Sequence, residues 1–117
     1  MMAAKSKRVN RMAELIQSII ARLLQKEVND PRLQNATITG VDLSPDGKRA
    51  TVYFSILDVN NDNIKLTTSA FQKAAGFFRF NLSQQTELRH TPQLHFLYDA
   101  SLMAAENVSR LINEVSA

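Results

Sequence analysis

Apolar residues recur at helical spacing over the first quarter of the chain and predict an amphipathic helix. They lie three or four positions apart, as one face of a helix requires: Val9, Met12, Ala13, Ile16, Ile19, Ile20, Leu23 and Leu24. We expect this helix to end near Val28. The next residues are Asn29-Asp30-Pro31, and proline disfavours helical geometry in the residue before it.

The period changes to two between Thr37 and Leu57, which predicts two strands. The alternation is clearest over residues 49–56, where Ala50, Val52, Phe54 and Ile56 alternate with Arg49, Thr51, Tyr53 and Ser55. Upstream the alternation is less regular, and Gly40 marks an expected β-bulge. Between the two segments, Ser44-Pro45-Asp46-Gly47 has the residues that a type I turn accepts. We therefore expect a β-hairpin.

Two helices, a third strand and a closing helix are predicted after the hairpin. The polar residues 60–63 offer a helix N-cap, and helical spacing then continues through Phe71 and Phe78. We expect two helices to meet at Gly76, because glycine can end one helix and redirect the next. Residues 94–98 predict a short strand and residues 102–115 a terminal helix. The predicted class is α+β, with helices covering one face of a three-stranded sheet.

Composition narrows the chemistry that the chain can perform. The 117 residues are 44% hydrophobic, enough for one ordinary domain with a real core. The absence of Cys excludes disulfides, a thiol nucleophile and cysteine-ligated metals. His90 and His95 lack a third ligand or a nucleophile partner, and no carboxylate pair suggests acid–base catalysis. No apolar run approaches the roughly 20 residues of a membrane span. We expect a cytoplasmic protein that is not an enzyme and uses no metal or other cofactor.

The net charge of +3 is concentrated near the N-terminus. Residues 1–49 hold nine basic and five acidic side chains, and residues 50–117 hold five and six. At about 100° per residue, five cations of the first helix fall within roughly 100° of its circumference, away from the apolar face. These five residues are called the basic stripe: Lys7, Arg8, Arg11, Arg22 and Lys26. Leu15 lies within the stripe, although that face should be solvated.

The basic stripe has three interpretations. It can be a merely solvated helix face. It can follow a nucleic-acid backbone, because clustered cations release counterions when they meet phosphates. It can also lie on an anionic membrane, although the apolar face has no Trp or Phe.

The element order is similar to the type II KH fold, an RNA-binding architecture that clamps the nucleic-acid backbone with a Gly-x-x-Gly loop between two helices. Here the corresponding break is Ala74-Ala75-Gly76. An Ala-x-Gly break in this position resembles the ribosome-binding factor A family. The resemblance extends over nearly the whole chain, through the segments Asp30-Pro31-Arg32-Leu33, Val52-Tyr53-Phe54, Gly76-Phe77-Phe78-Arg79, Leu88-Arg89, Pro92, Leu94, Phe96 and Asp99.

This resemblance implies a single KH-like domain over residues 1–117, in the order α-β-β-α-kink-α-β with a C-terminal helix. It implies a bacterial, non-catalytic ribosome assembly factor, important during growth in the cold. Such a factor binds the free, immature 30S small subunit and supports maturation of the 5′ region of 16S rRNA. We expect a monomer when the protein is free, and no membrane partner. Many family members continue into a charged tail, whereas this sequence ends at Ala117.

The candidate RNA-binding residues form two groups. The first is the basic stripe. The second is the interhelical break with its flanking cations: Lys73, Ala74, Gly76 and Arg79. Small side chains there would let an RNA backbone approach. Phe78 fits the core, whereas Phe77 and Phe80 cannot both share its face, so one of them could stack on a base. Tyr53, with Arg49 and Thr51, could line an open face of the sheet.

Two alternatives to RNA binding remain. A helix-turn-helix-like DNA regulator would also place two helices around a glycine, with Asn81, Gln84 and Gln85 available to read bases. A protein-interaction module would leave the stripe incidental.

Overall fold

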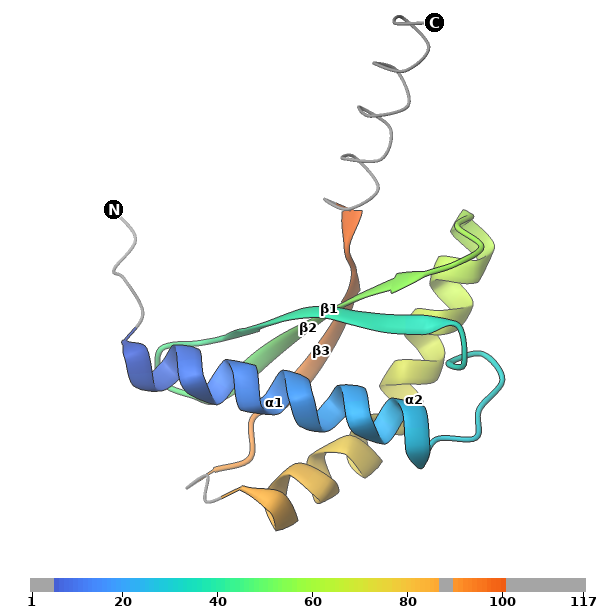
Figure 1. Cartoon of the computed structure of the whole chain (residues 1–117). Coiled ribbons are helices and arrows are strands. Elements are labelled where there is room, and N and C mark those ends of the chain that lie inside the picture. The colour runs from blue at the N-terminus through green and yellow to red at the C-terminus, as the bar shows by residue number, and fades with distance from the viewer. Residues whose placement is uncertain (1–5, 87–89, 101–117) are drawn as a thin grey trace, which may run out of the picture.

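The computed structural model describes residues 6–86 and 90–100, which form two helices and a three-stranded sheet (Figure 1). In chain order the elements are α1 (Lys7–Lys26), β1 (Ala36–Leu43), β2 (Arg49–Ile56), α2 (Asn61–Gln85) and β3 (Gln93–Tyr98). The predicted α+β class and KH-like fold are confirmed. The predicted helix over residues 102–115 lies outside the described residues.

The sheet has the order β1-β2-β3, with β1 antiparallel and β3 parallel to β2. The predicted bulge is present, because the β1–β2 register shifts between Ile38 and Gly40. The hairpin turn is also confirmed, since the Gly47 N–H donates to the Ser44 carbonyl at 2.9 Å. Gly47 has φ +74°, a left-handed conformation that glycine adopts without the steric penalty of a Cβ.

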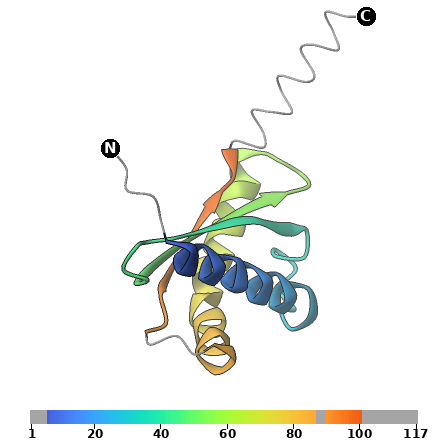
Figure 2. The same cartoon turned by 60° about the vertical axis from the view of Figure 1, so that its left-hand side comes forward.

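Both helices cover the same face of the sheet, α1 mainly over β1 and α2 mainly over β3 (Figures 1 and 2). The alternation in β2 turns Ala50, Val52 and Phe54 toward the helices, and all three are fully buried. The ring centroid of Phe71 on α2 lies 4.9 Å from that of Phe54 and 4.7 Å from that of Phe96. The aromatic cluster therefore fixes α2 on the sheet.

Helix α2 runs from Asn61 to Gln85 as one unbroken helix, so the prediction that two helices meet at Gly76 is wrong. The helix axis changes direction near its middle (Figure 1), but the helix is continuous from Asn61 to Gln85. Gly76 does not have a positive φ, and a Cβ added there would meet nothing within 4 Å. The glycine is therefore not a helix C-cap.

The ends of both helices follow local capping rules. The Ser6 hydroxyl accepts from the Val9 N–H at 3.2 Å, and the Asn60 side chain accepts from the Asn63 N–H at 2.8 Å, as the polar run over residues 60–63 predicts. Helix α1 ends at Lys26, two residues before the expected boundary. Arg32 then closes the loop with a fork of hydrogen bonds to Asp30.

Candidate nucleic-acid interface

The basic stripe lies along the solvent-exposed face of α1. The opposite face supplies the core through Ile16, Ile20 and Leu23, each at most 1% exposed, so the rotation of α1 is fixed. All five stripe cations are exposed to solvent. Leu15 within the stripe is 43% exposed, as its helical angle predicts. The structure therefore presents the five cations and one apolar side chain on a single surface.

No ion pair joins the stripe to a carboxylate among residues 6–86 and 90–100. Lys7 and Arg8 stand in the first turn of α1, which has no acidic residue. Cations at a helix N-terminus are disfavoured by the helix dipole by about 0.3–1 kcal/mol each. Two cations therefore occupy positions that helix stability alone disfavours, and their potential adds to that of the helix end.

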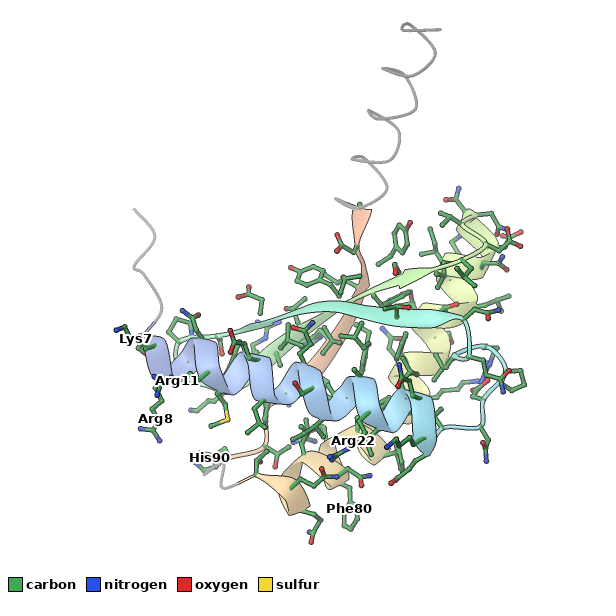
Figure 3. The ribbon with its side chains drawn as sticks, viewed as in Figure 1. Lys7, Arg8, Arg11, Arg22, Phe80 and His90 are labelled. Atoms are coloured by element: carbon green, nitrogen blue, oxygen red, sulfur yellow. The ribbon has the colours of Figure 1, made fainter. Side chains whose placement is uncertain are left out.

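Arg22 connects the stripe to the end of α2. Its Nη2 donates a hydrogen bond to Oε1 of Gln85. Figure 3 shows Arg22 over the C-terminal half of α2, while Lys7, Arg8 and Arg11 lie at the other end of α1. The stripe thus spans the length of α1 and reaches α2 only through Arg22 among the described hydrogen bonds.

The second predicted group does not converge on one surface. Lys73 lies close enough to the loop after α1 to help lower the pKa of Asp30, although the larger cause is the pair of hydrogen bonds from Arg32. Arg79 instead donates from Nε to the Pro92 carbonyl at 3.1 Å and from Nη2 to the Thr91 carbonyl at 3.3 Å. Ala74 packs against the core, and Gly76 is exposed. Lys73 and Arg79 therefore do not flank a common loop.

Phe77 and Phe80 both reach solvent, with 39% and 64% of their surface exposed. The Phe77 ring packs edge-to-face on Phe78, which is fully buried as predicted, with centroids 5.7 Å apart. Phe80 has no such ring contact among the described residues, and Figure 3 shows it projecting from the C-terminal half of α2. Phe80 is therefore the ring best placed to stack on an unpaired base.

Comparisons with known proteins cover most of the chain. The sequence profile of the family "Ribosome-binding factor A" matches residues 8–112. The chain belongs to the ribosome-binding factor A family. It is similar to the ribosome-binding factor A of Coxiella burnetii, with 45% identity over 107 residues that cover 92% of this chain and 88% of that protein.

Solved structures of the family share the fold. The crystal structure of ribosome-binding factor A from Thermus thermophilus matches with a TM-score of 0.69 at 23% identity, covering 77% of this chain and 93% of that one. A homology model of the Thermus thermophilus factor, fitted into an electron cryo-microscopy map of its complex with 30S, matches with a TM-score of 0.52 at 27% identity. That match covers 71% of this chain and 90% of the other.

The chain also has a basic depression that its sequence did not reveal. Residues at the start of β2 or just before it, on α2, and at the start of β3 or just before it line an open depression of about 520 Å³: Lys48, Arg49, Arg79, His90, Thr91 and Gln93. The period-two pattern of β2 places Arg49 on the open sheet face, but only the parallel pairing of β3 brings residues 90–93 beside it. The spacing of these residues in the sequence therefore could not predict that they lie together.

Tyr53 alternates with the buried Val52 and Phe54, as predicted, and lines a second depression of about 620 Å³ with Asp42, Tyr98 and Asp99. The Thr39 hydroxyl donates to Asp99 there at 2.7 Å. Arg49 and Thr51 do not line this depression. The two carboxylates make it a poor site for phosphate.

The described part of the chain contains neither a candidate metal site nor a helix that could span a membrane. Residues 6–86 and 90–100 contain no cluster of three or more acidic or histidine side chains that could hold a metal ion. Neither α1 nor α2 combines the length and apolar character that a membrane span requires.

Proposed function

We propose that this protein is a non-catalytic ribosome assembly factor that binds the free, immature 30S subunit. It contacts 16S rRNA and supports maturation of the 5′ region of that rRNA, with importance during growth in the cold. It acts in the bacterial cytoplasm as a monomeric single KH-like domain over residues 1–117 and leaves before translation. The observation that carries the proposal is family membership, together with the related Thermus thermophilus factor placed in a complex with 30S.

The basic stripe is the surface that we assign to the rRNA backbone. Its cations have no carboxylate partner among the described residues, so their charge is available to phosphates. Lys73 and Gly76 supply a second contact on α2, at the position of the family's Ala-x-Gly sequence. Because Gly76 sits inside a helix, its contribution is the absence of a side chain rather than a special backbone conformation.

Co-sedimentation with separated 30S subunits, 50S subunits and 70S ribosomes tests the proposal. We expect selective association with free 30S subunits. Arg11→Glu/Arg22→Glu should weaken this association, because it reverses two charges on the stripe, neither of them in the core. Lys65→Glu is the control, since Lys65 is an exposed cation of α2 outside both candidate groups. Equal binding by the folded double variant and the control would refute the role of the stripe.

Gly76→Val tests the second contact. Valine and glycine are both disfavoured in helices relative to alanine, by about 0.6 and 1 kcal/mol, so the stability of α2 should change little. The branched side chain projects into open space and should block close approach of an RNA backbone. Unchanged 30S association in a variant of unchanged helical content would remove Gly76 from the interface.

The helix-turn-helix alternative loses its structural basis. It requires a turn between two helices near Gly76, and α2 is continuous from Asn61 to Gln85. Preferential binding to duplex DNA without ribosomal association would nevertheless contradict the proposed function.

A further inference from the structure

The basic depression described above is built from three segments that are distant in the sequence. Lys48 and Arg49 stand where the hairpin turn enters β2, Arg79 comes from α2, and His90 precedes β3. Parallel pairing aligns Arg49 with Gln93, and the Gln93 N–H donates to the Lys48 carbonyl at 2.9 Å. The fold itself therefore holds these segments together.

Arg79 is solvent-exposed, but two hydrogen bonds hold its guanidinium in this depression. Its two hydrogen bonds to the carbonyls of Thr91 and Pro92 use Nε and one hydrogen of Nη2. A guanidinium has five N–H donors, so three remain available. Pro92 is fully buried, which anchors the loop that Arg79 grips. A preordered guanidinium loses little side-chain entropy when it binds an anion.

The lining has the composition of an anion site. It contains three permanent cations, one imidazole, the Thr91 hydroxyl and the Gln93 amide, and no carboxylate from the described residues. The nearby hairpin turn holds the carboxylate of Asp46, which accepts hydrogen bonds from the Ser44 hydroxyl at 2.6 Å and the Lys48 N–H at 3.0 Å. Although Asp46 lies near Lys48, the lining itself holds only cationic and neutral polar groups, a composition that attracts phosphate.

We propose that this depression is a binding site for a phosphodiester of the RNA that the protein binds. Arg49, Lys48 and Arg79 neutralise the phosphate, and Thr91 and His90 add hydrogen bonds. Figure 3 shows His90 at the same end of the molecule as Lys7, Arg8 and Arg11, so one RNA can extend from the stripe to this site. The inference rests on the proposed function, because it takes RNA as the ligand.

The test measures binding of deproteinised 16S rRNA by the full chain across a series of salt concentrations. Each lost phosphate contact should reduce the slope of log K against log salt by about 0.7–0.9. At 0.1 M salt this corresponds to a roughly five- to eightfold weaker affinity. Lys48→Gln and Arg49→Gln each remove one charge from the site. Lys65→Gln, which removes one exposed charge elsewhere, is the matched control.

Three outcomes decide between the possibilities. Loss of slope in both site variants, with the control unchanged, supports the site. Site variants that match the control, while Arg11→Gln/Arg22→Gln loses slope, overturn this inference and leave the proposed function intact. Absence of binding by the unaltered chain, both to this rRNA and to 30S subunits, overturns both.

A further measurement separates RNA from a small free anion. Inorganic phosphate is titrated in place of RNA while the amide resonances of Thr91 and Gln93 are followed by NMR. Saturation by millimolar phosphate, combined with no effect of the site variants on rRNA binding, would identify a small-anion site and overturn the RNA assignment. Shifts of the same resonances upon addition of rRNA, abolished in Arg49→Gln, support it.

Discussion

Replacing Gly76 by alanine should stabilise the protein, contrary to what a glycine at a helix junction would suggest. Gly76 lies inside α2, has no positive φ and faces open space. Alanine can adopt the same conformation and restricts the unfolded chain more than glycine does. The two residues differ by about 0.5–1 kcal/mol in a helix interior, in favour of alanine.

The gain can be converted into a melting temperature. Unfolding entropy of about 2.1 cal/mol/K per residue gives roughly 0.25 kcal/mol/K for a chain of this length. A gain of about 0.5–1 kcal/mol therefore raises the melting temperature by about 2–4 °C. Thermal unfolding followed by circular dichroism, with urea unfolding as a second measurement, resolves a change of this size.

The same substitution at Gly47 provides a control with the opposite sign. A Cβ at Gly47 also meets nothing within 4 Å, but the residue has φ +74°. Forcing alanine into this left-handed conformation should cost about 1–2 kcal/mol and lower the melting temperature by about 4–8 °C. A lower melting temperature for Gly76→Ala would refute the reasoning, because it would mean that Gly76 needs a conformation or clearance that α2 does not show.

Three further predictions concern the hairpin, the helix cap and the core. Asp46→Asn should weaken the dependence of the free energy of unfolding on acid pH. The hydrogen bonds from the Ser44 hydroxyl and the Lys48 N–H lower the pKa of Asp46. The stabilisation by this carboxylate is therefore present above about pH 4 and is lost as the pH falls through the folded-state pKa. Urea unfolding at pH 6 and pH 2.5 should show the two proteins closer in stability at the lower pH. Asn60→Ala should lower the free energy of unfolding by about 1 kcal/mol, because it removes the side chain that caps the Asn63 N–H. Asn61→Ala, one residue later and also exposed, should change it little in the same urea experiment. Phe71→Ala should cost about 3–5 kcal/mol, because the ring is fully buried between Phe54 and Phe96; a loss below 1 kcal/mol in urea unfolding would contradict the packing described.

Local signals in the sequence predicted the hairpin and the rotation of α1. Alternation over residues 49–56 places Ala50, Val52 and Phe54 inside, and all three are buried. The angular position of Leu15 predicts an exposed apolar residue, which the structure shows. These features depend on the spacing of neighbours within one element, so the sequence carries them directly.

The sequence alone could not show whether the helix breaks at Gly76. The outcome depends on the local helix propensity of glycine and on the packing of α2 against the sheet. Glycine costs a helix only about 1 kcal/mol relative to alanine. Phe71 and Phe78, on either side of Gly76, are both fully buried against the sheet. Burial of one such ring contributes about 1.5–3 kcal/mol. Packing on both sides therefore exceeds the local penalty, and α2 continues through the glycine.

Because α2 is continuous, Arg79 lies on a different surface from the one that a broken helix pair would give it. In a broken helix pair, Lys73 and Arg79 would flank one loop. In one continuous helix they are six residues apart, which is about 600° or, after whole turns, about 120° around the axis. They must therefore face different sides of α2. The charge of Lys73 acts weakly on Asp30 in the loop after α1, whereas Arg79 donates a hydrogen bond to the loop before β3. The unbroken helix thus gives Arg79 new neighbours, Lys48 and Arg49, and moves its charge into the basic depression.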